Sequence, residues 1–442
     1  MNTNLNILIV ANLDHASPRM PGLSQYLCSK EDTVRVISPI SSLDYKKKWA
    51  LGELDRNYFK VIDAPYSGDI LQVLRKLLWK LGFAKGKSLT EQLKPLPKNK
   101  DKNTKSFISK LPEFFLYKFQ EFFGIPDLEI TWYKSALKTS KKEINDEMPD
   151  VIISSSPYVT SHLVASRIKK KYDIPWIADF RDTWSNNPAY PFSKLRKKLD
   201  TYFERKIIAR ADLITTVSSI YKDKLKEIHK HDPFVIPNGY TTLSKNNNYL
   251  KKESINIVYT GTIYEGYQNF PEFLKGIKYG LENNFYKEKD INVNFYGRYI
   301  SKLEQKINEL GLEKIVSQNG FVEREKAFFY QSSSDLQLFF NWEGEKNGGL
   351  SHLKLYEYFG SMRPIMVCGK KEDKVNQNIV QSSNAGYVCI GRVEIANKIK
   401  DLIEIKKRLK SIPYNPNMDV LKKNSYYERG RELRAKISNL IS

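Results

Sequence analysis

Short apolar runs, each bounded by polar and turn-forming residues, recur along the first half of the chain. Each run has the length of a buried strand, and segments of helix length, such as 160–171, separate them. One helix is expected to begin near Leu23, after a turn-rich stretch. Strands that alternate with helices predict a parallel, doubly wound α/β sheet. The runs span residues 6–11, 34–38, 150–155, 175–179, 212–217 and 235–237.

The same pattern starts again in the second half. A polar stretch rich in Asn and Lys, 241–254, is typical of a linker. After it, helical spacing at 270–279 and 301–310 falls between further strand-like runs. These runs span 255–259, 292–296, 336–340, 364–367 and 386–390.

Two tandem Rossmann-like domains follow from this repetition. We expect an N-terminal domain over 1–240 and a C-terminal domain over 255–415. The last segment, 416–442, is predicted to contain a terminal helix at 425–441 that packs back on the first domain. Ligands of open α/β sheets bind at the carboxyl ends of the strands, so we expect the ligand in a cleft between the domains.

One segment, 70–142, departs from this pattern and is predicted to be a basic amphipathic insertion. Leucines recur at helical spacing in its first part and phenylalanines in a later part, with lysines between them. Such helices can lie in a membrane interface. Their apolar faces can equally pack on the sheet, and the sequence leaves both interpretations open.

The formal net charge is +22, from 72 Lys and Arg against 50 Asp and Glu in 442 residues. A chain this basic favours an anionic partner, such as a phosphorylated small molecule, an anionic lipid or nucleic acid. Its lysines are spread widely and form no RNA-binding motif or recognition helix, so nucleic acid is not expected. A proteome rich in Lys, Asn and Ile would also explain the charge.

The expected location is the cytoplasm. No apolar run reaches the roughly 18 residues of a transmembrane helix, and the first run lacks the basic lead and cleavage site of a signal peptide. Three widely spaced cysteines, Cys28, Cys368 and Cys389, fit a reducing compartment. Together with the charge, this predicts a cytoplasmic protein with peripheral contact at the inner face of the plasma membrane.

Four groups of motifs carry a resemblance to a known family. Together, in this order and at this spacing, they resemble family 4 of the GT-B glycosyltransferases, specifically the bacterial branch that builds capsule, lipopolysaccharide and other surface polysaccharides. The resemblance implies a GT-B fold, a nucleotide-sugar donor and a glycan or lipid-linked acceptor. The motifs are SSSPYVTSH (154–162) with IADFRDTW (177–184), ADLITTVS (211–218) with IPNG (236–239), YTGT (259–262), and GGLSHLKLYEYFGSMRP (348–364).

The last motif predicts a phosphate site on physical grounds. A Gly-Gly turn before a helix leaves backbone N–H groups free, and a helix N-terminus carries about half a positive charge. We therefore expect a diphosphate cradle at the start of this helix. It would comprise Gly348, Gly349, Leu350 and Ser351.

Lys354 and Glu357 follow one turn apart on one face of the same helix. Lys354 is expected to reach a phosphate, and the resemblance implies that Glu357 accepts the ribose hydroxyls. An ordinary surface ion pair is the alternative. Gly349 stands eight positions before Glu357, where retaining members often have a glutamate, and Glu343 and Glu345 are candidate substitutes.

Other donor contacts are expected at strand ends and at one early glycine. Gly261 and Thr262 open the first loop of the donor domain. That loop lacks the Arg and Lys that the family often carries there, so Arg298 is expected to supply a cation, with a plain surface arginine as the alternative. The resemblance places Val322 near the base. It places Gly22 in a glycine-rich loop at the donor phosphate, where a missing side chain lets the backbone approach closely.

Candidate catalytic residues lie in the first domain. Asp179 and Asp182 follow a predicted strand, and Asp182 is the better candidate to contact the acceptor hydroxyl or the reacting sugar. In an inverting enzyme it would be the general base. In a retaining one, which the resemblance implies, the donor phosphate takes the proton and Asp182 orients. A structural pair of Asp182 with Arg181 is the alternative, and His162 is a further candidate.

No Asp-x-Asp motif occurs in the chain, and the histidines form no metal-site spacing with cysteines or carboxylates. We therefore expect neither a metal nor another cofactor. The sequence predicts a metal-independent, retaining, hexosyltransferase-like enzyme. Two alternatives remain, a sugar-nucleotide epimerase on the same fold and a GT-B binding protein without catalysis.

Overall fold

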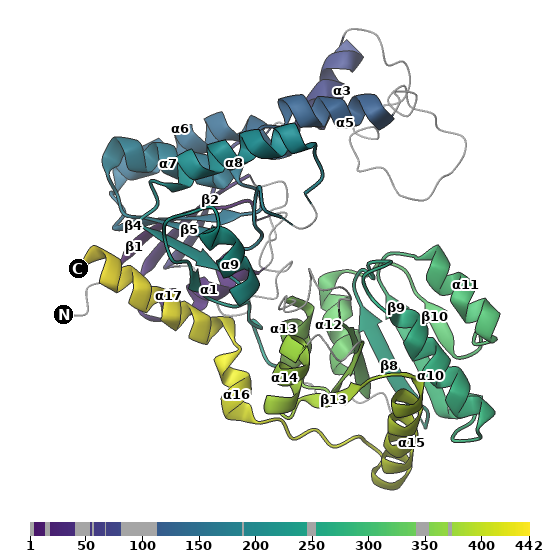
Figure 1. The fold of residues 1–442 in the computed structure, drawn as a ribbon. Coiled ribbons are helices and arrows are strands. Elements are labelled where there is room, and N and C mark those ends of the chain that lie inside the picture. Colours follow the sequence, from purple (N-terminus) through teal and green to yellow (C-terminus); the bar gives the residue numbers. More distant parts are fainter. Residues whose placement is uncertain are drawn as a thin grey trace.

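The chain folds into two parallel α/β sheets, each covered by helices on both faces (Figure 1). This confirms the predicted fold class. The computed structural model describes residues 4–13, 18–39, 54, 57–66, 68–80, 113–187, 190–244, 253–341, 353–369 and 374–442.

The N-terminal sheet has seven strands in the order β3-β2-β1-β4-β5-β6-β7. The strand order reverses between β1 and β4, which makes their carboxyl ends the switch point where ligands of such sheets bind. Each predicted run overlaps one strand, and β3 is an addition to the prediction. The strands are β1 (Asn6–Val10), β2 (Thr33–Ser38), β3 (Phe59–Asp63), β4 (Val151–Ser156), β5 (Trp176–Phe180), β6 (Leu213–Thr216) and β7 (Phe234–Val235).

Alternate residues of the central strands point to opposite faces of this sheet. Ile7 and Ile9 share a core with helices α1 and α17, whereas Leu8 and Val10 share one with the helical layer of α6, α7 and α8. Each fully buried Ile or Leu contributes roughly 2 kcal/mol. The helices are α1 (Arg19–Ser29), α6 (Tyr133–Asp146), α7 (Thr160–Tyr172), α8 (Lys194–Ile208), α9 (Ser219–Lys226) and α17 (Tyr426–Ile441).

The C-terminal sheet has six parallel strands in the order β10-β9-β8-β11-β12-β13. All five predicted runs are present, and β10 is an addition at the edge. The strands are β8 (Ile255–Thr260), β9 (Ile291–Tyr296), β10 (Val316–Gln318), β11 (Leu336–Phe340), β12 (Ile365–Cys368) and β13 (Gly386–Cys389).

Two cores sandwich this second sheet. One joins it to α10, α11 and α15, and the other joins it to α13, α14 and α16. Helix α12 lies beside β8. The helices are α10 (Phe270–Glu282), η3 (Glu288–Asp290), α11 (Ser301–Leu310), α12 (Arg324–Ser332), α13 (Leu353–Gly360), α14 (Lys374–Ser382), α15 (Arg392–Leu409) and α16 (Met418–Lys423).

Two passes of the chain connect the sheets side by side. Tyr240, on the way out of the first sheet, forms a parallel bridge with Ser425, on the way back. The Tyr240 N–H donates to Asn424 O at 3.1 Å, and the Tyr426 N–H donates to Tyr240 O at 2.9 Å. Helix α17 then packs along α1 on the N-terminal sheet (Figure 1).

Gly22 lies inside α1, which corrects the expectation of a phosphate-binding loop at this position. The helix begins at Arg19, four residues before its expected start. A Cβ on Gly22 would come within 2.6 Å of the Tyr426 ring. The glycine therefore makes room for α17.

The insertion 70–142 is described in two parts, and its apolar side chains differ in burial. The first part holds α3 (Ile70–Lys80), and the second holds α5 (Glu113–Phe123), η2 (Leu128–Trp132) and α6. Trp132 and Ala136 are buried in the core of the N-terminal sheet, so the end of the insertion packs on the fold. Phe122 and Phe123, at the end of α5, are exposed. Within the described ranges, no helix is long and apolar enough to cross a membrane.

Candidate functional site

A hollow opens at the carboxyl ends of β8, β9 and β10, with α12 and α13 on its other side. Helix α13 faces two ways, because Leu353 packs against the core of the N-terminal sheet while Lys354 and Glu357 line the hollow. Gly261 and Val322 line it too, so four predicted donor residues come together. The wall comprises Thr260, Gly261, Tyr296, Gly297, Phe321, Val322, Arg324, Ala327, Phe328, Gln331, Lys354 and Glu357.

Lys354 is partly buried, and its amine lies over the aromatic ring of Tyr259, 3.8 Å from the ring centroid. Its Nζ donates a hydrogen bond to Tyr259 Oη, which in turn donates to the carbonyl of Thr262 at 3.0 Å. Burial lowers the pKa of Lys354 to about 7, although the nearby Glu357 carboxylate raises it. An anion in the hollow would favour the charged amine. The position suits a phosphate-binding lysine. Thr262 supports it through its backbone carbonyl, which accepts the hydrogen bond from Tyr259.

Glu357 pairs with an arginine of the neighbouring helix and not with Lys354. Arg324 Nη2 lies 2.8 Å from Glu357 Oε1, and both side chains are partly exposed at the hollow. The carboxylate therefore stays accessible while its orientation is held. This matches a group that accepts hydrogen bonds from a bound ligand, as predicted for the ribose hydroxyls.

The floor of the hollow is made of backbone. Gly261 has a φ of +112°, in the region that favours glycine. A Cβ on Gly297 would lie 2.1 Å from Gly261 O, so the ends of β8 and β9 approach too closely for a side chain. A ligand can thus come close to the main chain at these two strand ends.

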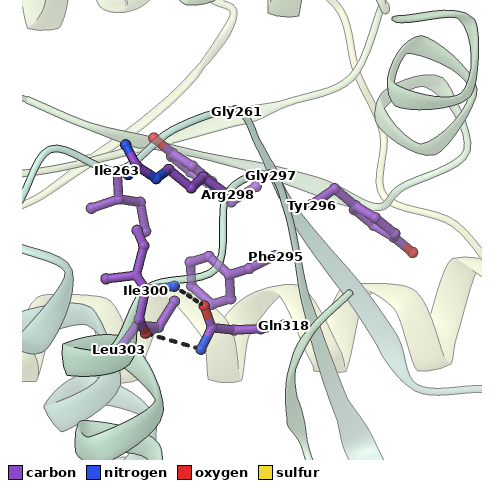
Figure 2. A pocket seen from close by; sticks show the side chains of 10 residues that line it. Gly261, Ile263, Phe295, Tyr296, Gly297, Arg298, Ile300, Leu303 and Gln318 are labelled. Atoms are coloured by element: carbon purple, nitrogen blue, oxygen red, sulfur yellow. Dashed lines mark hydrogen bonds between the residues drawn. The ribbon is translucent and has the colours of Figure 1, made fainter. Parts of the chain in front are cut away.

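Arg298 lies at a second, smaller hollow next to the first, beyond Gly297 (Figure 2). Its exposed side chain extends toward Ile263 in Figure 2 and makes no hydrogen bond or ion pair with any described residue. A cation at the ends of β8 and β9 fits the predicted role beside the phosphates.

Aromatic side chains surround Val322. Phe321 is almost fully exposed, and Tyr296 stacks on Tyr330 with ring centroids 4.1 Å apart. Tyr296 and Phe321 line the same hollow as Val322, and an aromatic ring offers a flat face to a planar base. The sequence reasoning did not select these rings, although Phe321 lies directly beside the predicted Val322 and Tyr296 lies two residues before the predicted Arg298.

Asp179 is buried at the end of β5 and holds Arg19 of α1. Arg19 Nε and Nη2 donate to it at 3.0 and 2.8 Å, and the hydroxyls of Ser155 and Thr215 each donate at 2.8 Å. Burial would raise the pKa of Asp179, but Arg19 and these hydroxyls lower it overall. Arg19 also donates to Pro237 O at 3.2 Å. These contacts make Asp179 a structural anchor, and the sequence reasoning did not foresee Arg19 as its partner.

Asp182 occupies the loop after β5 and is partly exposed. Tyr221 Oη donates to its carboxylate at 3.4 Å. Arg181 forms no ion pair with it, so the structural pair considered above is absent, and burial lowers the pKa of Arg181. Of the two aspartates, Asp182 is the one whose carboxylate remains accessible.

His162 is enclosed within the N-terminal sheet and its helices. Its Nδ1 lies 2.7 Å from Ser154 Oγ, which also accepts from Trp176 Nε1 at 2.7 Å, and its ring lies 4.5 Å from that of Phe180. Burial lowers the pKa of His162 to about 3, so the imidazole is neutral. The structure thus places His162 in the core of the N-terminal domain.

The predicted cradle, Gly348 to Ser351, lies outside the described residues, as do Glu343 and Glu345. Helix α13 is described from Leu353 onward. Across the described ranges there is no group of three or more His, Cys, Asp or Glu side chains that could hold a metal ion.

A comparison with known families gives a match to the model of Glycosyltransferase Family 4 over residues 106–242. The matched segment contains the motifs at 154–162, 177–184, 211–218 and 236–239. No curated protein matches the sequence.

Solved structures resemble the chain over nearly its whole length. A variant of S. aureus TarM, in complex with fondaparinux, alpha-GlcNAc-glycerol and UDP, has a TM-score of 0.55 at 11% identity, covering 99% of this chain and 100% of that one. The N-terminal domain of Candida albicans trehalose-6-phosphate phosphatase has a TM-score of 0.56 at 12% identity, covering 99% and 97%. A putative UDP-N-acetylglucosamine 2-epimerase from Listeria monocytogenes has a TM-score of 0.51 at 12% identity, covering 98% and 96%.

These comparisons confirm the resemblance to family 4 of the GT-B glycosyltransferases over the matched residues 106–242. The chain has the GT-B fold, and residues 106–242 within its first domain match the model of glycosyltransferase family 4. At such low identity the solved structures establish the fold alone, and one protein with that fold is described as a putative epimerase.

Proposed function

We propose that the protein is a glycosyltransferase that moves a sugar from a nucleotide-sugar donor to a glycan or lipid-linked acceptor. The observation that carries this proposal is the position of α13. Lys354 and Glu357 line one hollow with the Gly261–Gly297 floor, while Leu353 of the same helix touches the domain that carries the family signature.

The donor would lie along this hollow. Lys354 and Arg298 would hold the diphosphate, Glu357 would accept the ribose hydroxyls, and the base would lie near Val322. Lys354 supports the phosphate assignment most strongly, because a partly buried amine that bonds to a hydroxyl and not to a carboxylate gains most from a nearby anion. The segment Gly348–Ser351 would complete the diphosphate site at the start of α13.

Asp182 would act on the acceptor side of the reaction. Its accessible carboxylate at the end of β5 can accept a hydrogen bond from an acceptor hydroxyl or from the transferred sugar. We propose a retaining, hexosyl-transferring reaction, in which the donor phosphate takes the acceptor proton and Asp182 orients. We also propose that no metal is required, since lysine, arginine and backbone N–H groups can offset the diphosphate charge.

For the biological role, we propose the synthesis of bacterial surface polysaccharide, with peripheral contact between the protein and an anionic membrane. The motif groups shared with that branch support this role, as does the net charge of +22. A lipid-linked acceptor would lie at such a membrane.

Turnover tests the function and separates it from its rivals. The full chain is incubated with UDP-, GDP-, dTDP- and CMP-sugars, with and without glycan or lipid-linked acceptors. Products are followed by NMR and mass spectrometry. Transfer with release of nucleotide, unchanged by EDTA, is expected, and the anomeric signal of the product gives the stereochemistry. An altered free sugar without transfer would instead establish an epimerase, and binding without any turnover would establish a binding protein.

A further inference from the structure

Over residues 194–204, helix α8 buries charged side chains and exposes apolar ones, the reverse of the usual amphipathic pattern. Arg196, Asp200 and Glu204, spaced four residues apart, are buried against the fold. Leu195 and Leu199 face solvent on the same helix. A helix that covers a soluble core normally buries its apolar stripe and exposes its charges. Packing on the core beneath α8 therefore does not explain its exposed leucines.

Polar contacts on the inner side fix which face points outward. Arg196 donates to Asp200 at 2.9 Å, to the carbonyl of Glu121 and to Gly124 O at 2.7 Å. Glu204 accepts from the Ser185 N–H at 2.9 Å and from its hydroxyl at 2.5 Å. Rotating α8 to hide its leucines would break these buried bonds and leave charges without partners. The outward orientation is thus built into the fold.

The outward face is a continuous apolar stripe. Leu195, Leu199 and Tyr202 follow each other at helical spacing and are 70%, 44% and 59% exposed. Phe122 and Phe123, at the end of α5, are 68% and 60% exposed. The bonds from Arg196 to the carbonyls of Glu121 and Gly124 hold the end of α5 beside the start of α8, in the outer helical layer of the N-terminal domain (Figure 1). Monomeric soluble proteins rarely expose large apolar side chains in one group.

The charges on this face have one sign. Both acidic residues of α8, Asp200 and Glu204, are buried. The basic residues around the stripe remain at the surface, and Lys206 lies over the Tyr202 ring at 5.8 Å. They are Lys194, Lys197, Lys198, Arg205 and Lys206.

We propose that this surface, the apolar stripe of α8 with the exposed end of α5, docks on an anionic lipid bilayer. Leucine and aromatic side chains enter the interface, while a polar face of lysines and arginines binds anionic headgroups. The absence of exposed acid on α8 favours a bilayer of one charge over a protein partner with mixed charges. The inference rests on the proposed function only for its purpose, which is to hold the enzyme at a lipid-linked acceptor.

Vesicle binding tests the proposal without any donor or acceptor. The full chain is sedimented with phosphatidylcholine vesicles that contain or lack phosphatidylglycerol, at low and high salt. Binding is expected only with phosphatidylglycerol and is expected to fall with salt. Equal binding to neutral vesicles, or no binding to either, would overturn the proposal.

Two surface variants and one control locate the contact. Leu195→Gln/Leu199→Gln/Tyr202→Gln should weaken vesicle binding at least tenfold, and Lys194→Gln/Lys198→Gln/Lys206→Gln should remove its salt dependence. The control, Val393→Gln/Leu409→Gln, removes exposed apolar side chains from the basic helix α15 and should bind as wild type.

The apolar variant also distinguishes this proposal from its alternatives. Its thermal unfolding and its binding of soluble donor should match wild type, so a failure of the proposed function would show separately. Vesicle binding that is unchanged in this variant contradicts the assigned surface. If the variant instead loses self-association in sedimentation velocity while vesicle binding is unchanged, the surface binds a second copy and the lipid proposal is wrong.

Discussion

Glu357 forms an ion pair with Arg324 at 2.8 Å, although Lys354 lies one turn away on its own helix. The amine of Lys354 instead bonds to the hydroxyl of Tyr259. Two charged residues of one helix thus face the same hollow, and each is held by a different partner, Arg324 or Tyr259. This arrangement leaves the lysine charge available to an anionic ligand and the glutamate available to hydroxyl groups.

Lys354→Gln should weaken the binding of the preferred nucleotide-sugar by roughly 10- to 100-fold, the range for losing one charge-assisted hydrogen bond. Isothermal titration calorimetry measures the change, and Lys306→Gln on α11 serves as the surface control. An affinity equal to wild type would remove Lys354 from the donor site.

The lowered pKa of Lys354 predicts a proton linkage. In the free protein this amine loses its proton near pH 7, and a bound diphosphate raises the pKa again. Donor binding should therefore take up about one proton at pH 8 and almost none at pH 6, and affinity should fall as the pH rises above 7. Calorimetry in buffers of different ionisation enthalpy measures this uptake. A pH-independent affinity, or equal uptake in Lys354→Gln, would contradict the assignment.

Glu357→Ala should weaken donor binding roughly tenfold, because two ribose hydroxyls lose their acceptor. Glu309→Ala is a matched control, since Glu309 also pairs with a basic side chain, Lys306 at 2.7 Å, on the exposed face of α11. A nucleotide that lacks the ribose hydroxyls should bind wild type and Glu357→Ala equally. If Glu357→Ala still discriminates such analogues as wild type does, the carboxylate does not contact the ribose.

Asp179 and Asp182 should respond differently to the same substitution. Asp179→Asn leaves Arg19 buried without its counter-charge and should cost about 3–5 kcal/mol of unfolding free energy. Asp182→Asn should lower kcat by roughly 100-fold or more, with little change in stability or donor affinity. Urea unfolding and steady-state kinetics measure the two effects. A stable Asp179→Asn with lost turnover would reverse the two roles.

His162 should make the fold sensitive to acid. Its pKa is lowered from 6.5 to about 3 by burial, so the neutral form is preferred in the folded state. The corresponding stability is present above the unfolded pKa and is lost as the pH falls from 6.5 toward 3, at about 1.4 kcal/mol per pH unit. Unfolding free energies at pH 7, 5.5 and 4 should show a smaller slope in His162→Asn than in wild type. The exposed His231→Asn should keep the wild-type slope.

The central strands of both sheets could be predicted because they are buried on both faces and form continuous apolar runs. The two that were missed, β3 and β10, lie at sheet edges. Lys60 of β3 and Ser317 of β10 face solvent, so neither strand forms an apolar run. One-sided burial removes the signal on which the strand prediction depends.

The site residues could be predicted where they lie close together in one sequence motif. Lys354 and Glu357 share one helix, so their spacing placed them on one face. Their partners come from distant segments, Tyr259 from β8 and Arg324 from α12, and local spacing contains no information on such pairs. The same holds for Asp179, whose role as an anchor depends on Arg19 of α1.

The most direct test of the central claim is a thermal-shift measurement on wild type and Lys354→Gln with UDP-, GDP-, dTDP- and CMP-sugars. A ligand that binds only the folded protein raises the melting temperature, by an amount that grows with its concentration over Kd. One nucleotide class is expected to stabilise wild type and to have a much smaller effect on Lys354→Gln. No shift with any nucleotide-sugar, or the same shift in both proteins, would contradict a donor site in the α13 hollow.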